Sequence, residues 1–205
     1  MIKLACFDFS KTVAKDTGFG AGPAFLGRKK DYDKLYSKFK NGELNEESFV
    51  KSVVKLWKGL KETDLVKIHS QIELNPNIKL VLKQLHNIGI KTALISYIPT
   101  KLAELYKDLG FDFLSGTECE IKNGVFTGNI IKMNSDKSLA IKKICRMNKM
   151  NAKSSIAIGD SVNDIKMFKT VGFSNSFAYN ALEKVKKHAK HHISDFKEIT
   201  KIIKQ

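Results

Sequence analysis

Apolar runs and segments with helical periodicity alternate along most of this 205-residue chain. Residues 2–9, IKLACFDF, form an apolar run that is too short for a helix and therefore predict a buried strand. Residues 90–96 and 154–160 predict buried strands for the same reason. Amphipathic segments separate these runs, and this alternation is typical of βαβ units in a mostly parallel sheet. We therefore expect an α/β protein with a doubly wound, Rossmann-like core.

The second half of the chain adds further elements to this core. Residues 75–89 predict a helix that opens with Asn-Pro and ends at a glycine. Residues 118–131 predict a hairpin that turns at Asn123 and Gly124, and a short strand is expected near residues 172–174. The remaining expected elements are a strand at 111–116 and helices at 100–110, 135–147, 163–172, 180–189 and 195–203.

Residues 15–73 contain helical patterns but no apolar run that predicts a strand. This absence indicates a helical insertion between the first two strands of the core. We expect residues 1–14 and 74–205 to form the α/β core domain and residues 15–73 to form a small helical cap domain. Within the cap, helices are expected at 28–42, 44–57 and 61–72.

The charge of the chain narrows the choice of partners. The formal net charge is +15, but Arg28 and Arg146 are the only arginines, and the lysines are scattered along the chain. Specific nucleic-acid recognition usually depends on arginine side chains, so this composition does not favour nucleic acid as a partner. A positive protein can still attract a phosphorylated substrate.

The sequence also bears on the compartment of the protein. No apolar run approaches the ~18 residues that a membrane span needs, and the first residues lack the pattern of a signal peptide. The cysteines, Cys6, Cys119 and Cys145, are odd in number and far apart. This spacing fits neither a disulfide framework nor a zinc site. We expect free thiols in a soluble, cytoplasmic protein with no membrane partner.

Three aspartates stand at the ends of expected strands or soon after them. Asp8 ends the first strand, and Asp160 and Asp164 follow a later one. Because ligands bind at the carboxyl ends of the strands in such sheets, we expect these carboxylates to lie close together. Like charges at short range raise one another's pKa unless a cation lies among them. A hard divalent cation with oxygen ligands, Mg²⁺ above all, is therefore the expected cofactor.

Two more residues add groups that suit phosphate chemistry. Ser96 ends a strand and offers a hydroxyl group with nearby backbone N–H groups, and Lys137 lies at the start of a helix as a point charge. A nucleophilic carboxylate, a metal, a hydroxyl and a lysine together suit phosphoryl transfer through an aspartyl-phosphate. Each residue alone also suits a structural role, such as a turn, a helix cap or a surface lysine. Their order and placement together favour catalysis.

Four short segments form an ordered set along the chain. FDFSKTV (7–13) is close to the pattern Asp-x-Asp-x-Thr/Val, and LISY (94–97) places Ser at the end of a strand. Lys137 opens a helix, and IAIGDSVNDIKMF (156–168) contains Gly-Asp-x-x-Asn-Asp. In this order the segments resemble the four motifs of the haloacid dehalogenase (HAD) superfamily, most closely its phosphoserine phosphatase branch. The insertion at 15–73 and the hairpin before Lys137 match that branch, so the resemblance covers essentially the whole chain.

The resemblance implies an Mg²⁺-dependent phosphatase or phosphotransferase that acts on a small phosphorylated metabolite. Asp8 would be the nucleophile and a metal ligand, and the backbone oxygen of Ser10 would be a second ligand. Asp160 would bind the metal directly, with Asp164 as a ligand or as support. Lys137 would join Asp8 and Ser10 in the catalytic set. The residues that hold the phosphoryl group would be Ser96, Tyr97, Lys137 and Asn163.

Ser10 departs from the first motif, which has a second aspartate at this position. In the family, that aspartate protonates the leaving group and later activates the attacking water. A serine hydroxyl does neither at neutral pH, and the loss of a general acid–base typically costs ~10²–10⁴-fold in rate. The ion-pumping ATPases of the superfamily resemble this pattern, with a hydroxyl residue at the same place and a long-lived phosphoenzyme. We therefore expect a slowed enzyme rather than an inactive one.

The cap departs from the phosphoserine phosphatase branch where the branch grips its substrate. A Glu after the first motif and an Arg in the cap hold the amine and the carboxylate of the amino acid in that branch. These positions fall at Thr17 and near Val53 in this sequence, with Lys51 as a distant substitute and Arg28 in a different place. A charged group left without a partner is costly, so we expect L-phosphoserine to be a poor substrate.

Two other functions stay open at the level of the sequence. Ser10 favours a non-catalytic phosphate-ligand sensor or regulatory protein on the HAD fold, whereas the intact Asp8, Lys137, Asp160 and Asp164 argue against it. A basic nucleic-acid-binding protein would need its lysines clustered on one face of the fold. The oligomeric state is not indicated by any pattern in the chain.

Two stretches remain outside these motifs. GFGAG (18–22) lacks the strand–helix context of a nucleotide-binding loop, and we interpret it as a flexible hinge over the site that serves as a lid. The tail HAKHHIS (188–194) carries His188, His191 and His192. We interpret it as the solvated end of a helix rather than a metal site.

Overall fold

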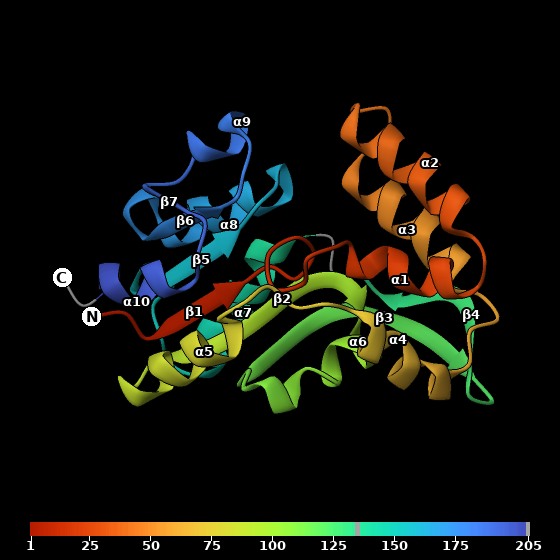
Figure 1. The fold of residues 1–205 in the computed structure, drawn as a ribbon, viewed down its shortest axis with the longest axis horizontal. Helices are drawn as coiled ribbons and strands as arrows, with labels where there is room; N and C mark the ends of the chain where they lie inside the picture. The colour runs from red at the N-terminus through yellow and green to blue at the C-terminus, as the bar shows by residue number, and fades with distance from the viewer. Residues whose placement is uncertain (134–135, 204–205) are drawn as a thin grey trace.

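The computed structural model describes residues 1–133 and 136–203. They form a seven-stranded sheet in the order β4-β3-β2-β1-β5-β6-β7 (Figure 1). Neighbouring strands are parallel except for β3 and β4, which form an antiparallel hairpin. The expected mostly parallel sheet is therefore confirmed. The strands are β1 (Leu4–Phe7), β2 (Lys91–Pro99), β3 (Phe113–Lys122), β4 (Val125–Lys132), β5 (Ser155–Gly159), β6 (Ser176–Tyr179) and β7 (His191–Ile193).

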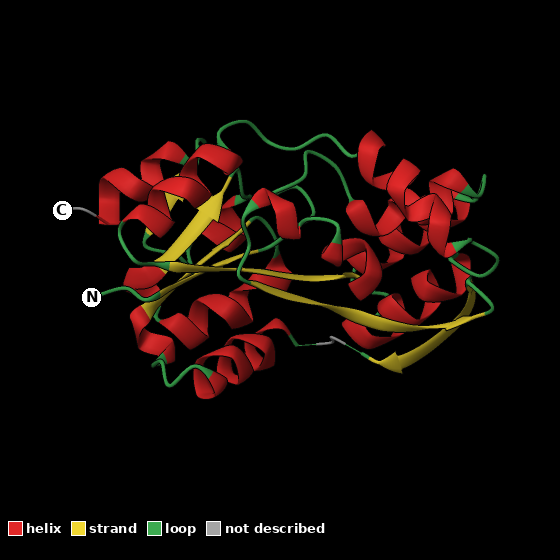
Figure 2. Ribbon diagram, turned by 90° about the horizontal axis from the view of Figure 1, so that it is seen from below, coloured by secondary structure: helices red, strands yellow, loops and turns green. Residues whose placement is uncertain are grey.

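Helices cover both faces of the sheet, as Figure 2 shows. They are α1 (Gly18–Phe25), α2 (Lys29–Lys40), α3 (Glu46–Leu56), α4 (Leu65–Gln71), α5 (Ile78–Asn87), α6 (Thr100–Glu104), α7 (Lys137–Met147), α8 (Ile165–Val171), α9 (Glu183–Lys186) and α10 (Lys197–Ile203). Ala5 and Phe7 of β1 belong to an apolar core that includes α5 and α10. Leu4 and Cys6 belong to a second core that includes α7 and α8. This alternation along one buried strand makes the fold doubly wound.

Helices α1 to α4 come from the segment between β1 and β2, where the sequence predicts no strand. In Figure 1, α2 and α3 stand away from the sheet, while α1 and α4 lie nearer to it. Ala14 and Leu74 pair in an isolated bridge, and the backbone N–H of Lys15 donates to the carbonyl of Glu73 at 2.9 Å. The chain therefore leaves the sheet and returns to it at adjacent points.

The hairpin of β3 and β4 turns where the sequence predicts. Asn123 has a φ of 51° and Gly124 a φ of 72°, which is the backbone of a tight two-residue turn. The hairpin supports the helical insertion, because Gly59 donates a backbone hydrogen bond to Phe126 and Phe126 donates one to Leu60. The β3–β4 hairpin of the sheet thus holds the part of the insertion that follows α3.

The glycine-rich stretch at 18–22 is neither a loop nor a hinge, and this interpretation was wrong. It forms most of α1, whose glycines are buried under aromatic rings. A Cβ atom on Gly18 would lie 2.2 Å from the ring of Phe9, and one on Gly22 would lie 2.6 Å from the indole of Trp57. The glycines therefore allow aromatic rings to pack closely against a helix. The composition of residues 18–22 resembles that of a loop, which explains the wrong interpretation.

The C-terminal third differs from the expected element order. The expected strand near 172–174 is instead β6, a few residues later, and the long helix expected at 180–189 is reduced to the four residues of α9. The tail is not a helix end, because His191 and His192 lie in β7 at the edge of the sheet. Helix α7 begins at Lys137, and residue 135, where the sequence places its start, lies outside the described residues.

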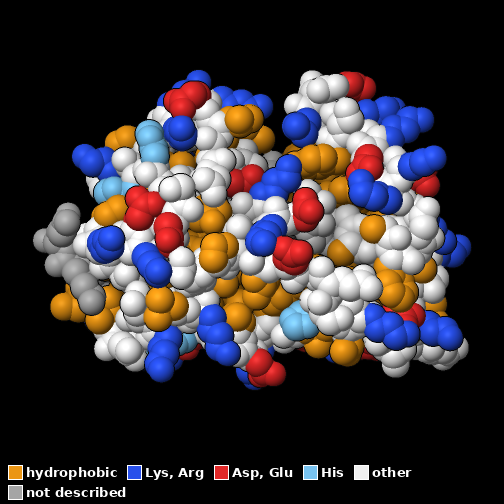
Figure 3. Space-filling model, viewed as in Figure 1, with side chains coloured by type: hydrophobic (Ala, Val, Ile, Leu, Met, Phe, Trp, Pro, Cys, Tyr) orange, Lys and Arg blue, Asp and Glu red, His pale blue; other side chains and the backbone are white. Residues whose placement is uncertain are grey.

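The outer surface reflects the high lysine content of the chain. On the face seen in Figure 3, Lys and Arg side chains lie scattered among acidic ones over both halves of the molecule. Cys6, Cys119 and Cys145 are free thiols, as expected. None of the helices within residues 1–133 and 136–203 has the length and apolar character needed to cross a membrane.

Candidate active site

The three aspartates picked out by their strand positions come together at one edge of the sheet. Phe7 of β1 lies in register with Ile158 of β5, so Asp8 and Asp160 follow adjacent parallel strands, with Asp160 one residue further along. The backbone N–H of Asp8 extends the ladder and donates to the carbonyl of Ile158 at 2.9 Å. Carboxylate oxygens of Asp8, Asp160 and Asp164 all lie within 4.8 Å of one another.

Asp164 organises the loop that follows β5. Its Oδ2 accepts hydrogen bonds from the backbone N–H groups of Asp160 and Ser161, at 3.1 and 3.0 Å, and from the Ser161 hydroxyl at 3.0 Å. A Cβ atom at residue 159 would lie 2.4 Å from Cγ of Asp164, so only glycine leaves room there for this carboxyl group. Asp164 is fully buried and does not line the cavity described below, which suits a supporting role.

Lys137 joins two of these aspartates. Asp136 caps the first turn of α7, because the Ser138 N–H donates to its side chain at 2.8 Å. Lys137 is therefore the first residue of the helix. The Lys137 ammonium donates to Oδ1 of Asp8 and, at 2.7 Å, to Oδ1 of Asp164. Burial acts to lower the pKa of Lys137, but the charges of Asp164 and Asp8 outweigh it and raise that pKa. The ammonium therefore stays charged.

The electrostatics of the cluster suit a divalent cation. Burial raises the pKa of Asp8, and the charge of Asp164 adds to this rise although Lys137 opposes it. Burial also raises the pKa of Asp160, with further contributions from Asp8 and Asp164. When all three carboxylates are ionised, the ammonium of Lys137, which pairs with two of them, leaves two negative charges at the cluster, and one divalent cation would balance these. All the donor atoms are oxygens, the ligands that Mg²⁺ prefers.

The loop after Asp8 carries Ser10 into the wall of the same cavity. Lys11 has a φ of 60°, and the backbone N–H of Ala14 returns to the carbonyl of Phe9 at 2.8 Å, so the chain reverses tightly here. The Thr12 hydroxyl reaches across to Asp160 Oδ1 at 3.4 Å. This turn holds Ser10 in the cavity wall two residues after Asp8.

A bulge in β2 places Ser96 in the site. The pairing of β2 with β3 shifts register between Ile95 and Pro99, and such irregularities redirect side chains near ligand sites. The backbone N–H of Ile98 donates to the Ser96 hydroxyl at 3.3 Å. Tyr97 follows, with its ring 5.1 Å from the ammonium of Lys137. The expected site residues that line the cavity are Asp8, Ser10, Ser96, Tyr97, Lys137, Asp160 and Asn163.

The cavity has a volume of about 440 Å³, within the ~300–1,000 Å³ common for small-ligand sites. It lies between the helical insertion and α9, where Figure 3 shows the surface hollowed. The wall on the side of the insertion consists of rings and lysines that the sequence did not single out for binding: Phe19, Tyr32, Tyr36, Phe39, Phe49, Lys11 and Lys40. Lys184 of α9 lines the cavity from the other side. A signal was present, because aromatic residues at 32, 36 and 39 fall on one face of a helix.

The two positions that differ from the phosphoserine phosphatase branch have different surroundings. Thr17 lines the cavity and shares a hydrogen bond with Tyr32. Val53 is fully buried and is not part of the cavity wall. Arg28 donates to the carbonyls of Leu56 and Lys58, at 2.8 and 2.6 Å, and thus braces the insertion. The arginine of the insertion therefore has a structural partner away from the cavity.

Lys51, the distant substitute for that arginine, also has a partner elsewhere. Its ammonium pairs with Glu47 one helical turn away, and the lysine side chain is about half exposed. Neither Arg28 nor Lys51 lines the cavity.

Comparisons with known proteins show the family of the chain. Residues 40–203 match the model of the haloacid dehalogenase-like hydrolases, and the chain belongs to this family, in its phosphoserine phosphatase-like branch. A phosphoserine phosphatase of Archaeoglobus fulgidus is 30% identical over 90% of the chain and 54% of the relative. One of Methanocaldococcus jannaschii is 27% identical over 98% of both chains. The chain thus spans about half of the first relative and nearly all of the second.

Solved structures give the same picture for the fold. A phospho-aspartyl intermediate analogue of phosphoserine phosphatase has a TM-score of 0.84 at 26% identity, and covers 98% of both chains. A substrate-bound phosphoserine phosphatase complex has a TM-score of 0.85, with the same identity and coverage. The helical insertion and the sheet are therefore both shared with these enzymes.

Proposed function

We propose that this chain is an Mg²⁺-dependent phosphatase that acts on a small phosphorylated metabolite and turns over slowly. The observation that carries the proposal is the arrangement of Lys137 between Asp8 and Asp164, beside Asp160, at the wall of a cavity. The relatives named above, which are phosphoserine phosphatases, support the reaction class. A nucleophilic carboxylate with a fixed ammonium beside it suits phosphoryl transfer.

Asp8, Asp160 and the backbone oxygen of Ser10 would hold Mg²⁺, with Asp164 fixing the loop that carries Asp160. Bound there, the metal would offset negative charge on the phosphoryl oxygens. Ser96, Tyr97, Asn163 and Lys137 line the cavity next to this centre and would hold the phosphoryl group. The roles of these residues are part of the proposal.

In the first step, Oδ2 of Asp8 bonds to phosphorus while the bond from phosphorus to the ester oxygen breaks. The Lys137 ammonium holds Oδ1 of the same carboxylate. This contact orients Oδ2 and favours the ionised form of Asp8. The leaving oxygen departs with the bonding electrons and receives no proton from Ser10, whose hydroxyl has no accessible pKa near neutrality. Esters of acidic alcohols, such as phenols, are therefore the expected good substrates.

In the second step, water attacks phosphorus, the bond to Oδ2 breaks, and inorganic phosphate leaves with Asp8 restored. This step needs a base to take the proton of water, and Ser10 does not supply one. The aspartyl-phosphate should therefore accumulate. The slow step belongs to the second half of the reaction.

Residues 15–73 would act as a cap domain over the core formed by residues 1–14 and 74–205. The adjacent exit and return of the chain at Ala14 and Leu74 support this division. Glu46 at the start of α3 pairs with Lys166 of α8 at 3.3 Å, which ties the insertion to the opposite side of the cavity. Closure of such a cap would exclude water from the first step.

The test is hydrolysis of an aryl phosphate by the purified chain, with Mg²⁺ and with a chelator. Asp8→Asn should abolish turnover, and Asp160→Ala should abolish Mg²⁺ binding in calorimetry while the fold, followed by circular dichroism, persists. Asp108→Ala, at an exposed aspartate outside the motifs and the cavity wall, is the matched control. Unchanged Mg²⁺ affinity in Asp160→Ala would refute the metal site.

A second candidate is a non-catalytic phosphate-ligand sensor on the same fold, and Ser10 is the observation that favours it. Such a protein would bind phosphate esters in the same cavity but neither form an adduct nor release phosphate. Binding without turnover by the wild type and by a Ser10→Asp variant would support this function over the enzyme.

A further inference from the structure

The wall of the cavity that faces away from Asp8 is unusually aromatic. Its rings come from the inserted helices α1, α2 and α3: Phe19, Tyr32, Tyr36, Phe39 and Phe49. They form ordered contacts, since Phe39 stacks on Phe49 at 4.4 Å and Tyr32 stacks on Tyr36 at 5.9 Å, each pair within 9° of parallel. Such a wall presents flat apolar surface, against which a planar group packs well.

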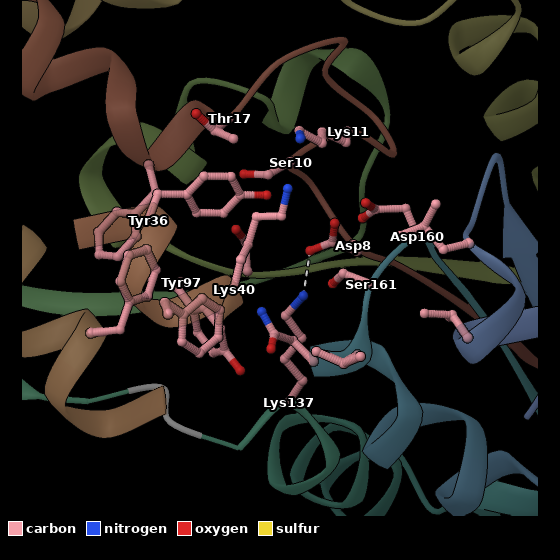
Figure 4. Close-up of a pocket in the computed structure, with 18 of the residues that line it drawn as sticks. Asp8, Ser10, Lys11, Thr17, Tyr36, Lys40, Tyr97, Lys137, Asp160 and Ser161 are labelled. Carbon is pink, nitrogen blue, oxygen red and sulfur yellow. Dashed lines mark hydrogen bonds and ion pairs between the residues drawn. The ribbon is translucent and has the colours of Figure 1, made fainter. Parts of the chain in front are cut away.

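The same wall carries positive charge. The ammonium of Lys11 lies 5.3 Å from the centre of the Tyr36 ring, and that of Lys40 lies 5.8 Å from it. Figure 4 shows Lys40 extending into the cavity from the insertion and Lys11 entering from the loop after Ser10. Both lysines are exposed, so neither needs its charge compensated by a protein partner. They converge on one ring from two separate elements.

No carboxylate of the described chain lines this part of the cavity. The lining carboxylates are Asp8 and Asp160, and both lie at the catalytic centre. At Thr17, where the branch has a glutamate, the side chain is already hydrogen-bonded to Tyr32. The charges of Asp16 and Asp33 reach Tyr32 of this wall, but neither residue lines the cavity. An ammonium group on a substrate would therefore meet the two lysines with no carboxylate in contact, whereas an anionic group would be attracted by both lysines.

We propose that the cavity takes phosphomonoesters whose leaving group is a planar aromatic ring with a second anionic substituent. This inference rests on the proposed function only in that the ring departs during the reaction. The recognition of the ligand depends on the aromatic and lysine wall. The ring packs against Tyr36 and its neighbours, and the anion lies between Lys11 and Lys40. The site thus selects against an aminoacyl phosphate through its charge rather than its size.

The proposal can be tested without turnover, because phosphonates carry a carbon in place of the ester oxygen and are not hydrolysed. Calorimetry on the wild type with Mg²⁺ would compare 4-carboxybenzylphosphonate, 4-(aminomethyl)benzylphosphonate, benzylphosphonate and cyclohexylmethylphosphonate. The carboxylate analogue should bind at least about tenfold more tightly than the amine analogue. Benzylphosphonate should bind more tightly than its saturated counterpart, because only the flat ring stacks on the wall.

Two variants locate the charge preference. Lys40→Met should reduce the ratio of affinities for the carboxylate and amine analogues, and Lys38→Met, at an exposed lysine on the same helix outside the cavity, should leave the ratio unchanged. Equal or tighter binding of the amine analogue, or a ratio unaffected by Lys40→Met, would overturn the proposal. The failure of the proposed function is a separate result: no aryl ester is hydrolysed, while the order of phosphonate affinities persists and still supports this ligand class.

Discussion

Ser10 stands two residues from Asp8 in the wall of the cavity, where a group with an ionisable proton would assist both halves of a phosphatase reaction. A hydroxyl group can accept and donate hydrogen bonds there, but it does not exchange a proton with a leaving alcohol or with water near neutral pH. The ion pairs of Lys137 with Asp8 and with Asp164 do not involve the Ser10 side chain. The slow turnover that we propose would therefore be confined to proton transfer.

Ser10→Asp should raise the rate of aryl phosphate hydrolysis by about 10²-fold or more, because it supplies the missing acid–base group. The measurement is steady-state kcat with Mg²⁺. Ser10→Asn is the matched control, since its side chain has nearly the shape of aspartate but does not ionise. An Asp variant no faster than the Asn variant would contradict the assignment of the slow step.

Asp112 is a carboxylate with a structural role, far from the motifs. It accepts hydrogen bonds from the Lys91 ammonium and the Thr92 backbone N–H, each at 2.8 Å, and contacts His86 at the same distance. Burial alone would raise its pKa, but these hydrogen bonds outweigh burial and lower the pKa below the ordinary 3.8. The ionised form of Asp112 therefore stabilises the junction of β2 with α5.

This lowered pKa predicts how stability depends on pH. A carboxyl group with a lowered pKa in the folded state contributes its full stability above the ordinary pKa, and loses it as the pH falls through the folded value. Asp112→Asn should cost about 1–2 kcal/mol near pH 7, and the difference from wild type should shrink as the pH falls below 3.8, the ordinary pKa of aspartate. Urea unfolding across this range, with Asp108→Asn as control, measures it. A difference that grows on acidification would contradict the assignment.

At the scale of elements, α1 is a helix whose glycines let aromatic rings approach its backbone. Gly22 faces the indole of Trp57, and the Trp57 N–H donates to the carbonyl of Phe19 at 3.2 Å. Helix propensity alone would favour alanine over glycine here. The contact with Trp57 excludes alanine at this position, because the indole is fully buried and has no room to move.

Gly22→Ala should therefore lower the free energy of unfolding by about 1–3 kcal/mol, the usual cost of overpacking a core. Ala24→Ser, at an exposed position of the same helix, should change it by less than about 0.5 kcal/mol. Urea unfolding followed by the fluorescence of Trp57 reports both. An alanine variant as stable as wild type, with unchanged fluorescence, would show that α1 does not pack as described.

Local patterns predicted some elements and not others, for identifiable reasons. The β3–β4 turn follows from Asn123 and Gly124, because both adopt the positive φ that these residue types favour. Strand β7 carries no such signal: it has three residues at the edge of the sheet, two of them histidines, and the stacking of His191 on Phe177 at 4.5 Å is a long-range contact. A strand held by such contacts is not visible in its own sequence.

At the scale of the whole molecule, topology explains why the meeting of the aspartates was predictable. Parallel strands bring their carboxyl ends to one edge, so residues as distant in sequence as Asp8, Ser96 and Asp160 meet there whatever the loops do. The opposite wall of the cavity follows from no such rule. Its place depends on how α2 packs against α1 and α3, which is why Tyr36 and Lys40 were not predicted to line the site.

The central claim is that Asp8 accepts a phosphoryl group, and intact-mass spectrometry after a brief reaction with an aryl phosphate and Mg²⁺ tests it most directly. The wild type should gain the mass of one phosphoryl group, mapped to the peptide that contains Asp8, with a matching burst of phenol. Asp8→Asn should gain none, and Ser10→Asp should retain less of the adduct because it hydrolyses faster. The absence of both adduct and turnover in the wild type and in Ser10→Asp would contradict the claim.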